Sequence, residues 1–208
     1  MRVFRYTRHV YDSVSRTQTP FLNLPMSGSM KLMDAAESLF LEKGFDATTV
    51  SDIVARAGVA KGTYYHYFAA KPDIYEALRH RYMDWFLSQT QQAMDACAAG
   101  DADARLAAWC DRSVTAYTEK QELHDVLFHQ GFHQQGNDHE NAVLNQLLAL
   151  IAEGEKHSHW RVAHPDITAM IIYHGMHAAV DTLPQSGHYT AQTLGGVLYE
   201  QFLRFLKA

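Results

Sequence analysis

The chain has 208 residues, of which 47% are hydrophobic and 12% aromatic, so it is long enough to bury a core and to form one or two domains. No apolar run approaches the roughly 20 residues that a membrane-spanning helix needs. Residues 1–28 lack the continuous apolar stretch of a secretory signal, and Cys97 and Cys110 are the two cysteines. We therefore expect a cytoplasmic protein without a membrane partner and without a disulfide framework.

The formal net charge is −5, but the charge is unevenly distributed along the chain. Residues 1–82 contain 11 lysines and arginines against 8 acidic residues, whereas residues 83–208 contain 7 against 15. The total argues against a nucleic-acid partner. A basic N-terminal region followed by an acidic body nevertheless favours a DNA-contacting head at the N-terminal end.

Apolar residues recur with helical periodicity from Ser29 onward, and no sustained alternation of β-branched residues indicates a strand. The fold class is therefore all-α, with about nine helices. Residues 1–28 end in prolines, serines and a glycine and are expected to be a disordered extension. Helices are predicted over 30–43, 50–57, 61–68, 71–99, 102–118, 121–135, 138–158, 164–182 and 189–206.

Strong start and stop signals mark the second of these helices. Thr49-Val50-Ser51-Asp52 has the pattern of a capping box, in which the threonine hydroxyl accepts from the backbone amide three residues on. Gly44 ends the helix before it and Gly58 ends this helix, because glycine adopts a positive φ at little cost. A third helix begins at Lys61, after a turn of three residues.

The third helix has two distinct faces. Tyr64 and Phe68 are four residues apart and are expected to face the core. The opposite face consists of Lys61, Gly62, Tyr65 and His66. Two short helices joined by a tight turn that contains glycine form a helix-turn-helix, whose second helix enters the major groove of DNA.

This segment resembles the DNA-binding domain of the TetR family of bacterial transcription regulators. The resemblance is carried by Gly44-Phe45, Thr48-Thr49-Val50, Ile53-Val54, Ala57-Gly58-Val59, the run from Lys61 to Phe68, and Lys71. Ala60 and Tyr64 depart from the family pattern, which has serine at the first position and leucine, isoleucine or phenylalanine at the second. The later helices agree with the family only in number and order.

The resemblance implies a helix-turn-helix DNA-binding domain over 29–75 and a ligand-binding and dimerisation domain over 76–208. Such a protein is a homodimeric transcription regulator, most often a repressor that a small-molecule effector releases from double-stranded operator DNA. Phosphate contacts are implied for Thr49, Tyr65, Tyr67 and Lys71, and groove contacts for Lys61, Gly62, Thr63 and His66. Hydroxyl and lysine donors suit both kinds of contact.

Apolar stripes on the last two predicted helices, together with the resemblance, indicate a four-helix dimer interface. The residues predicted for it are Ile171, Gly175, Ala178, Leu194, Leu198, Phe202 and Phe205. Core packing is the default explanation for the large side chains of the body, but the resemblance implies an apolar effector pocket among them. The residues predicted for the pocket are Trp85, Phe86, Trp109, Tyr117, Phe128, Phe132, Met170 and Tyr173.

Two histidine pairs support an alternative function. His129 and His133 are four residues apart and His174 and His177 are three apart, so each pair can present two imidazoles on one helix face. A metal-responsive regulator or a metal-binding helical enzyme is therefore the alternative. No glutamate follows His129 as in the H-E-x-x-H zinc motif, and no Ser-His-Asp order, P-loop or dinucleotide fingerprint is present. We accordingly predict no enzyme activity, no metal site and no cofactor.

Overall fold

The computed structural model describes residues 26–129, 138–157, 160–182 and 187–207, and within these ranges the chain is helical without a strand, which confirms the all-α class. Its elements, in chain order, are α1 (Met26–Ala47), α2 (Val50–Ala57), α3 (Lys61–Tyr67), α4 (Lys71–Asp95), α5 (Ala102–Glu119), α6 (Gln121–His124), the π-helical turn η1 (Asp125–His129), α7 (Asp138–His157), α8 (Pro165–Thr182) and α9 (Ala191–Leu206). None of the described helices is both long and apolar enough to span a membrane.

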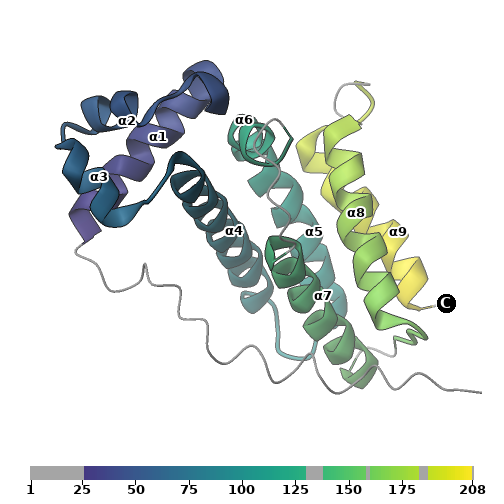
Figure 1. Cartoon of the computed structure of the whole chain (residues 1–208). Coiled ribbons are helices and arrows are strands. Elements are labelled where there is room, and N and C mark those ends of the chain that lie inside the picture. Colours follow the sequence, from purple (N-terminus) through teal and green to yellow (C-terminus); the bar gives the residue numbers. More distant parts are fainter. Residues whose placement is uncertain (1–25, 130–137, 158–159, 183–186, 208) are drawn as a thin grey trace, which may run out of the picture.

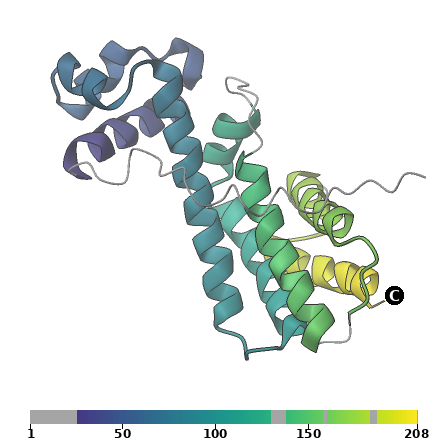
Figure 2. The same ribbon diagram turned by 60° about the horizontal axis from the view of Figure 1, so that its bottom comes forward.

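The helices form two regions, which we call the head (α1–α3) and the body (α4–α9). Figure 1 shows the head at one end of the molecule, and α4 runs from it beside α5 into the body. Helix α5 is central to the body because it packs against α4, α7, α8 and α9. Figure 2 shows from a second side how α4 extends past the head along the body. The head also touches the body through contacts of α1 with α6 and η1.

One half-buried amide, that of Gln146, bonds to side chains of two other helices of the body. Trp109 of α5 is fully buried, and its indole Nε1 donates to Oε1 of Gln146 on α7 at 3.0 Å. The same oxygen accepts from Oγ1 of Thr90 on α4 at 2.9 Å. Buried polar groups are stabilising only when they are paired, so this network fixes how α4, α5 and α7 pack.

Close packing in the body depends on two glycines. A Cβ atom added to Gly195 of α9 would lie 2.6 Å from Cα of Asp111 on α5. One added to Gly154 of α7 would lie 2.0 Å from the Trp160 ring. Neither position has room for a side chain, and at Gly195 the obstacle is backbone that cannot rotate away.

The observed elements depart from the predicted ones mainly in four places. Helix α1 continues to Ala47, past its predicted end at Lys43, with a kink at Gly44, whose φ is 82°. Helix α1 begins at Met26, so the last residues of the expected extension 1–28 are helical, and residues 1–25 lie outside the described residues. Helix α4 ends at Asp95, four residues earlier than predicted. The helix expected over 121–135 is instead α6 followed by η1, and its remainder lies outside the described residues.

A tyrosine of α4 bonds to the backbone of the π-turn. Oη of Tyr75, on α4, donates to the backbone carbonyl oxygens of Val126 and Leu127, each at 2.9 Å. A carbonyl oxygen has two lone pairs, so the buried hydroxyl gives each of these two carbonyls a partner from α4. Burial raises the pKa of Tyr75 to about 12, so the hydroxyl stays a donor.

Candidate DNA-binding surface and effector region

Local hydrogen bonds form the helix-turn-helix. Thr49 caps α2: its Oγ1 accepts from the backbone nitrogen of Asp52 at 3.1 Å, and Oδ2 of Asp52 accepts from the backbone nitrogen of Thr49 at 2.8 Å. Gly58 ends α2 in the left-handed conformation with φ 65°. Helix α3 then begins at Lys61, and its N-cap residue Ala60 makes no side-chain cap. The predicted capping box and stop signal are confirmed.

Ion pairs on the outside of the head hold α2 against α1. Arg56 donates to both carboxylate oxygens of Glu42, at 2.6 and 2.7 Å, and Lys43 donates to Asp52 at 2.8 Å. The Arg56 guanidinium lowers the pKa of Glu42 to about 2, and the Lys43 ammonium lowers that of Asp52. Both carboxylates are therefore charged at neutral pH, and they fix the approach of the two helices.

Helix α3 has the two faces that its sequence predicts. Tyr64 and Phe68 are buried, and Oη of Tyr64 donates to the carbonyl oxygen of Ala70 at 3.1 Å. Lys61, Gly62, Tyr65 and His66 are exposed on the other side, with Tyr65 exposed by 53%. The exposed set offers an ammonium, a phenol and an imidazole on one short helix.

The other residues predicted to contact DNA differ in their surroundings. Thr49 is exposed although its hydroxyl also bonds to Asp52, and Thr63 is half-buried. Tyr67 is half-buried too, with its ring against Gly28, where an added Cβ atom would lie 2.8 Å from the Tyr67 hydroxyl oxygen. These positions border the exposed face of α3 or the start of α2.

The assignment of Lys71 to a phosphate contact needs correction. Its Nζ donates to the carbonyl oxygens of Phe45, Asp46 and Thr48 at 2.6, 3.4 and 2.9 Å, and it lies 4.1 Å from the centre of the Phe45 ring. An ammonium has three protons, and three carbonyls use them all. Lys71 therefore closes the loop between α1 and α2, and burial lowers its pKa.

Seven rings gather in the body where α4, α5, the α6–η1 segment and α8 meet. We call this the aromatic cluster, and its members are Tyr82, Trp85, Tyr117, His124, Phe128, Tyr173 and His177. His124 is central: its ring centre lies 4.4 Å from that of Tyr117 and 4.9 Å from that of Phe128. Such close ring pairs stabilise a buried region beyond their area alone.

Several side chains of the aromatic cluster carry polar atoms that are surrounded by apolar rings. Oη of Tyr82 is buried without a hydrogen-bond partner among the described residues, and burial raises its pKa. Burial lowers the pKa of His124 to about 3 and that of His177 to about 4, so both imidazoles are neutral at pH 7. Tyr117 is paired, because its hydroxyl donates to Asp181.

The predicted effector residues separate into groups in the structure. Trp85, Tyr117, Phe128 and Tyr173 belong to the aromatic cluster. Phe86 and Trp109 are buried in the core of the body. The prediction that Met170 lines an effector pocket is wrong. Its side chain is 43% exposed, on the α8 face that also exposes Ile167 and Ile171. Phe132 lies outside the described residues.

Three members of the aromatic cluster were not among the predicted effector residues. Tyr82 precedes Trp85 by three positions on α4, so helical spacing was a usable signal for it. His177 was considered only as a metal ligand. No local pattern indicated His124, because the π-turn that follows it depends on Tyr75 of another helix.

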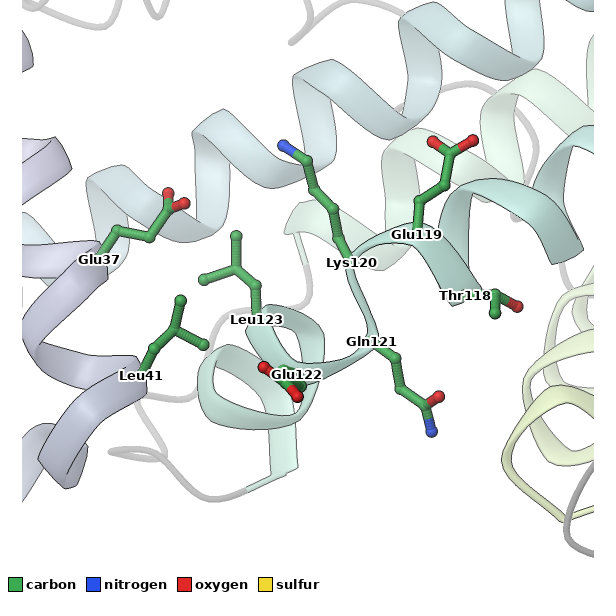
Figure 3. Close-up of a pocket in the computed structure, with 8 residues that line it drawn as sticks. All are labelled: Glu37, Leu41, Thr118, Glu119, Lys120, Gln121, Glu122 and Leu123. Carbon is green, nitrogen blue, oxygen red and sulfur yellow. The ribbon is translucent and has the colours of Figure 1, made fainter.

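A separate cleft of about 420 Å³ lies between head and body. Figure 3 shows its lining, which comes from α1 and from the turn between α5 and α6: Glu37, Leu41, Thr118, Glu119, Lys120, Gln121, Glu122 and Leu123. Nζ of Lys120 lies 4.2 Å from the ring centre of Trp85, so this cleft borders the aromatic cluster. Its charged lining differs from the apolar pocket that the sequence predicts.

The members of the predicted histidine pairs have different surroundings. His174 is exposed on α8, whereas His177 is half-buried and packs against Tyr173, with ring centres 4.6 Å apart. His129 lies at the end of η1, and its predicted partner His133 is outside the described residues.

An exposed apolar surface remains on the last two helices. Ile167, Met170 and Ile171 of α8 are 50, 43 and 48% exposed, and Phe205 of α9 is 57% exposed. Ala178 is also exposed, two turns further along α8 from Ile171. Contiguous exposed apolar groups of this kind mark interaction surfaces.

Four residues predicted for the dimer interface belong to the chain's own core, which corrects that prediction. Leu194, Leu198 and Phe202 are buried on α9, which packs along α5. A Cβ atom added to Gly175 would lie 3.4 Å from the Phe202 ring, so Gly175 faces α9 of the same chain. The apolar stripe of α9 was recognised correctly, but most of it is used inside the monomer.

Comparison with known proteins agrees with this geometry. Residues 32–78 match the family model described as "Bacterial regulatory proteins, tetR family". The transcriptional repressor KstR2 of Mycobacterium tuberculosis is 35% identical over 68 residues, which cover 33% of this chain and 34% of that protein. The negative transcriptional regulator IcaR of Staphylococcus aureus is 44% identical over 46 residues, or 22% and 25% of the two chains. The match thus spans about a third of these relatives or less.

Solved structures resemble nearly the whole chain. FadR from Bacillus subtilis in complex with stearoyl-CoA has a TM-score of 0.72 at 23% identity, covering 85% of this chain and 98% of that one. A protein from Rhodococcus sp. RHA1 has a TM-score of 0.75 at 16% identity, covering 92% and 100%. The fold is therefore that of a helix-turn-helix head on a helical body. Within it, the helix-turn-helix segment, residues 32–78, is similar to that of the TetR family.

Proposed function

We propose that the chain is a homodimeric, DNA-binding transcription regulator whose operator affinity is changed by a small molecule bound in the body. The observation that carries the proposal is the exposed face of α3, with Lys61, Tyr65 and His66 opposite the buried Tyr64 and Phe68. The second helix of a helix-turn-helix enters the major groove with such a face. The proposed DNA-binding domain is residues 29–75, and residues 76–208 carry the effector and the dimer contact.

The individual contacts follow from chemistry and burial. Lys61 and Thr63, at the start of α3, are placed to reach base edges, with Gly62 allowing close approach and His66 one turn further on. Tyr65 and Tyr67 supply hydroxyls, and Thr49 a hydroxyl beside the N-terminus of α2, for phosphate oxygens. Lys71 is left out of this set because three carbonyls hold its ammonium.

The dimer contact is proposed at the exposed apolar surface of α8 and α9. Burying Ile167, Ile171 and Phe205 against the same residues of a second copy gives a two-fold symmetric interface. A dimer presents two α3 helices, which a palindromic operator needs at a separation of about 34–36 Å.

The aromatic cluster is the proposed effector site. Its apolar rings suit an apolar molecule, and the Tyr82 hydroxyl, which has no partner in the described part of the chain, suits one hydrogen-bonding group on that molecule. The structural relative FadR, which was solved with stearoyl-CoA, supports a body that accepts an effector with a long apolar chain. Repression is the proposed sign of regulation, because KstR2 and IcaR are named as a repressor and a negative regulator.

Two elements connect the effector site with the head. Helix α4 begins at Lys71 beside the loop between α1 and α2 and carries Tyr82 and Trp85 further along. The α6–η1 segment contributes His124 and Phe128 to the cluster and also touches α1. A molecule that displaces rings in the cluster therefore moves elements that position the head.

The test is footprinting of the full chain on the DNA upstream of its own coding region, repeated with a metabolite panel. The proposal expects a protected palindrome that one compound releases. Calorimetry then measures the affinity of that compound with and without saturating operator. Coupling of this kind is typically 5–150-fold and must be equal in both directions. Equal compound affinities in the two experiments would exclude effector-driven release, and the absence of any protected site would count against the whole proposal.

A further inference from the structure

Three side chains of the α6–η1 segment converge on one point at the edge of the aromatic cluster. Nδ1 of His129 lies 3.2 Å from Oδ1 of Asp125, and Nδ1 of His124 lies 3.8 Å from the same oxygen. One potential ligand atom from each of the three residues lies within 4.8 Å of the other two. His124 is buried, whereas Asp125 is half-buried and His129 is exposed, so the point is open to solvent on one side.

The π-turn is what brings the two histidines together. Residues five apart on an α-helix differ in direction by about 140°, so His124 and His129 would face away from each other. In the structure their ring centres are 5.1 Å apart. Tyr75 holds the turn in place through the carbonyls of Val126 and Leu127. Single π-turns occur frequently at functional sites, so the convergence of the two histidines indicates a binding site.

An independent observation concerns the imidazole of His124. This side chain is only 5% exposed, and its Nδ1 has no hydrogen-bond partner among the described residues. A buried nitrogen without a partner is unfavourable, so it indicates a missing ligand. The rings of Tyr117 and Phe128 fix its orientation.

We propose that His124, Asp125 and His129 bind one divalent transition-metal ion of the Zn²⁺, Co²⁺ and Ni²⁺ class. Two imidazole nitrogens and one carboxylate oxygen are a donor set that these ions prefer, whereas Mg²⁺ and Ca²⁺ prefer oxygen ligands throughout. Ligands at about 2.1 Å from a tetrahedral ion are about 3.4 Å from one another, close to the observed 3.2 and 3.8 Å. Water occupies the remaining position, on the side of His129.

The site goes beyond the proposed regulation, because it requires neither operator nor effector. Its three ligands come from the α6–η1 segment, which contacts both α1 and α4. An ion bound there crosslinks the last residue of α6 to both ends of η1. The expected physical consequence is a more stable α6–η1 segment when the ion is present.

The test uses the full chain, stripped with EDTA, dialysed and titrated with ZnCl₂ by calorimetry. We expect one ion per chain and a higher Tm, and no binding when MgCl₂ replaces ZnCl₂. Asp125→Asn and His124→Gln should each weaken Zn²⁺ binding at least about tenfold. The matched control is His164→Ala, which removes an exposed histidine just before α8 and should bind Zn²⁺ as the parent chain does. Far-UV circular dichroism checks that each variant is folded.

Two outcomes would overturn the assignment. One is the absence of stoichiometric Zn²⁺ binding by the parent chain. The other is binding that survives in Asp125→Asn and His124→Gln but is lost in His133→Ala, because the ion would then belong to the i,i+4 pair of His129 and His133. Asp125→Asn keeps the test valid if His124→Gln does not fold, since Asp125 is not buried.

Discussion

The surface of the head and the interior of the body differ in the interactions that join their helices. On the surface of the head, α1 and α2 are joined by exposed ion pairs such as Arg56–Glu42, each of which contributes little because water screens it, and beneath them lies a small buried core that includes Ile53 and Tyr64. In the body, the main contacts are buried, such as the bond from Trp109 to Gln146 and the approach of Gly195 to Asp111. Substitutions in the exposed ion pairs of the head should therefore be tolerated, whereas small changes among the buried groups of the body should be severe.

The largest expected effect is that of Gly195→Ala. The new Cβ atom would meet the backbone of Asp111 at 2.6 Å, so α5 and α9 must separate, at a cost of about 3 kcal/mol. Gly196→Ala is the matched control, because its Cβ atom meets nothing within 4 Å and alanine favours a helix. Urea denaturation at one protein concentration measures both variants. Equal stability of the two would contradict the close approach of α5 and α9.

The second effect concerns association. Ile171→Glu places a charge in the exposed apolar surface of α8, and we expect the dimer to dissociate about 100-fold more readily, since burying an unpaired carboxylate is strongly unfavourable. Leu41→Glu, at an exposed leucine of α1, is the control and should remain dimeric. Light scattering over a dilution series decides between them. If Ile171→Glu dimerised as tightly as the parent chain, the dimer interface would have to lie on another surface.

The third effect tests the contact between α4 and the π-turn inside the body. Tyr75→Phe removes the hydroxyl that serves the carbonyls of Val126 and Leu127, and its loss should cost about 1–2 kcal/mol. Tyr65→Phe removes an exposed hydroxyl and should leave stability unchanged. Urea denaturation again gives the comparison. If Tyr75→Phe unfolds like the parent chain, this hydroxyl does not hold the π-turn.

A smaller effect separates the two regions by pH. Burial lowers the pKa of His177 to about 4 from an ordinary value of 6.5, so the unfolded chain takes up a proton before the folded one does. The free energy of unfolding is therefore unaffected by protonation of His177 above pH 6.5, and it decreases as the pH falls from 6.5 toward 4. The corresponding loss for Glu42 of the head, whose pKa is lowered from 4.5 to about 2, falls below pH 4.5. The body should therefore weaken first on acidification.

Replacing His177 with glutamine checks this order. The variant has no titrating group at that position, so its urea stability should change less than that of the parent chain between pH 6.5 and 4. Tryptophan fluorescence reports on the body, because Trp85, Trp109 and Trp160 all lie outside the head. Parallel curves for the two proteins would mean that His177 does not titrate in this range.

The same contrast explains how much of the structure could be predicted from the sequence. The capping box at Thr49, the stop at Gly58 and the two faces of α3 are local signals, and the structure has all of them. The π-turn at Asp125 depends on Tyr75, which lies about 50 residues earlier in the chain. No pattern within residues 121–135 contains that information.

Predictions for the sites show the same division. The apolar stripe of α9 was visible, but its pattern does not say whether Phe202 packs inside the chain or against a second copy. Lys71 has the residue type and position of a phosphate contact, and only the folded loop shows that three carbonyls hold it. At such positions the residue type predicts the kind of interaction, but the group that the side chain contacts comes from a distant segment of the chain.

The central claim is that the exposed face of α3 binds DNA, and one measurement tests it directly. The affinity of the full chain for its upstream operator is measured by fluorescence anisotropy for Lys61→Ala and for Lys156→Ala, which removes the same charge from an exposed position on α7. The account predicts that Lys61→Ala loses about 1–3 kcal/mol of binding free energy, or about 5–150-fold in Kd, and that Lys156→Ala binds normally. Equal affinity of Lys61→Ala, Lys156→Ala and the parent chain would contradict the account.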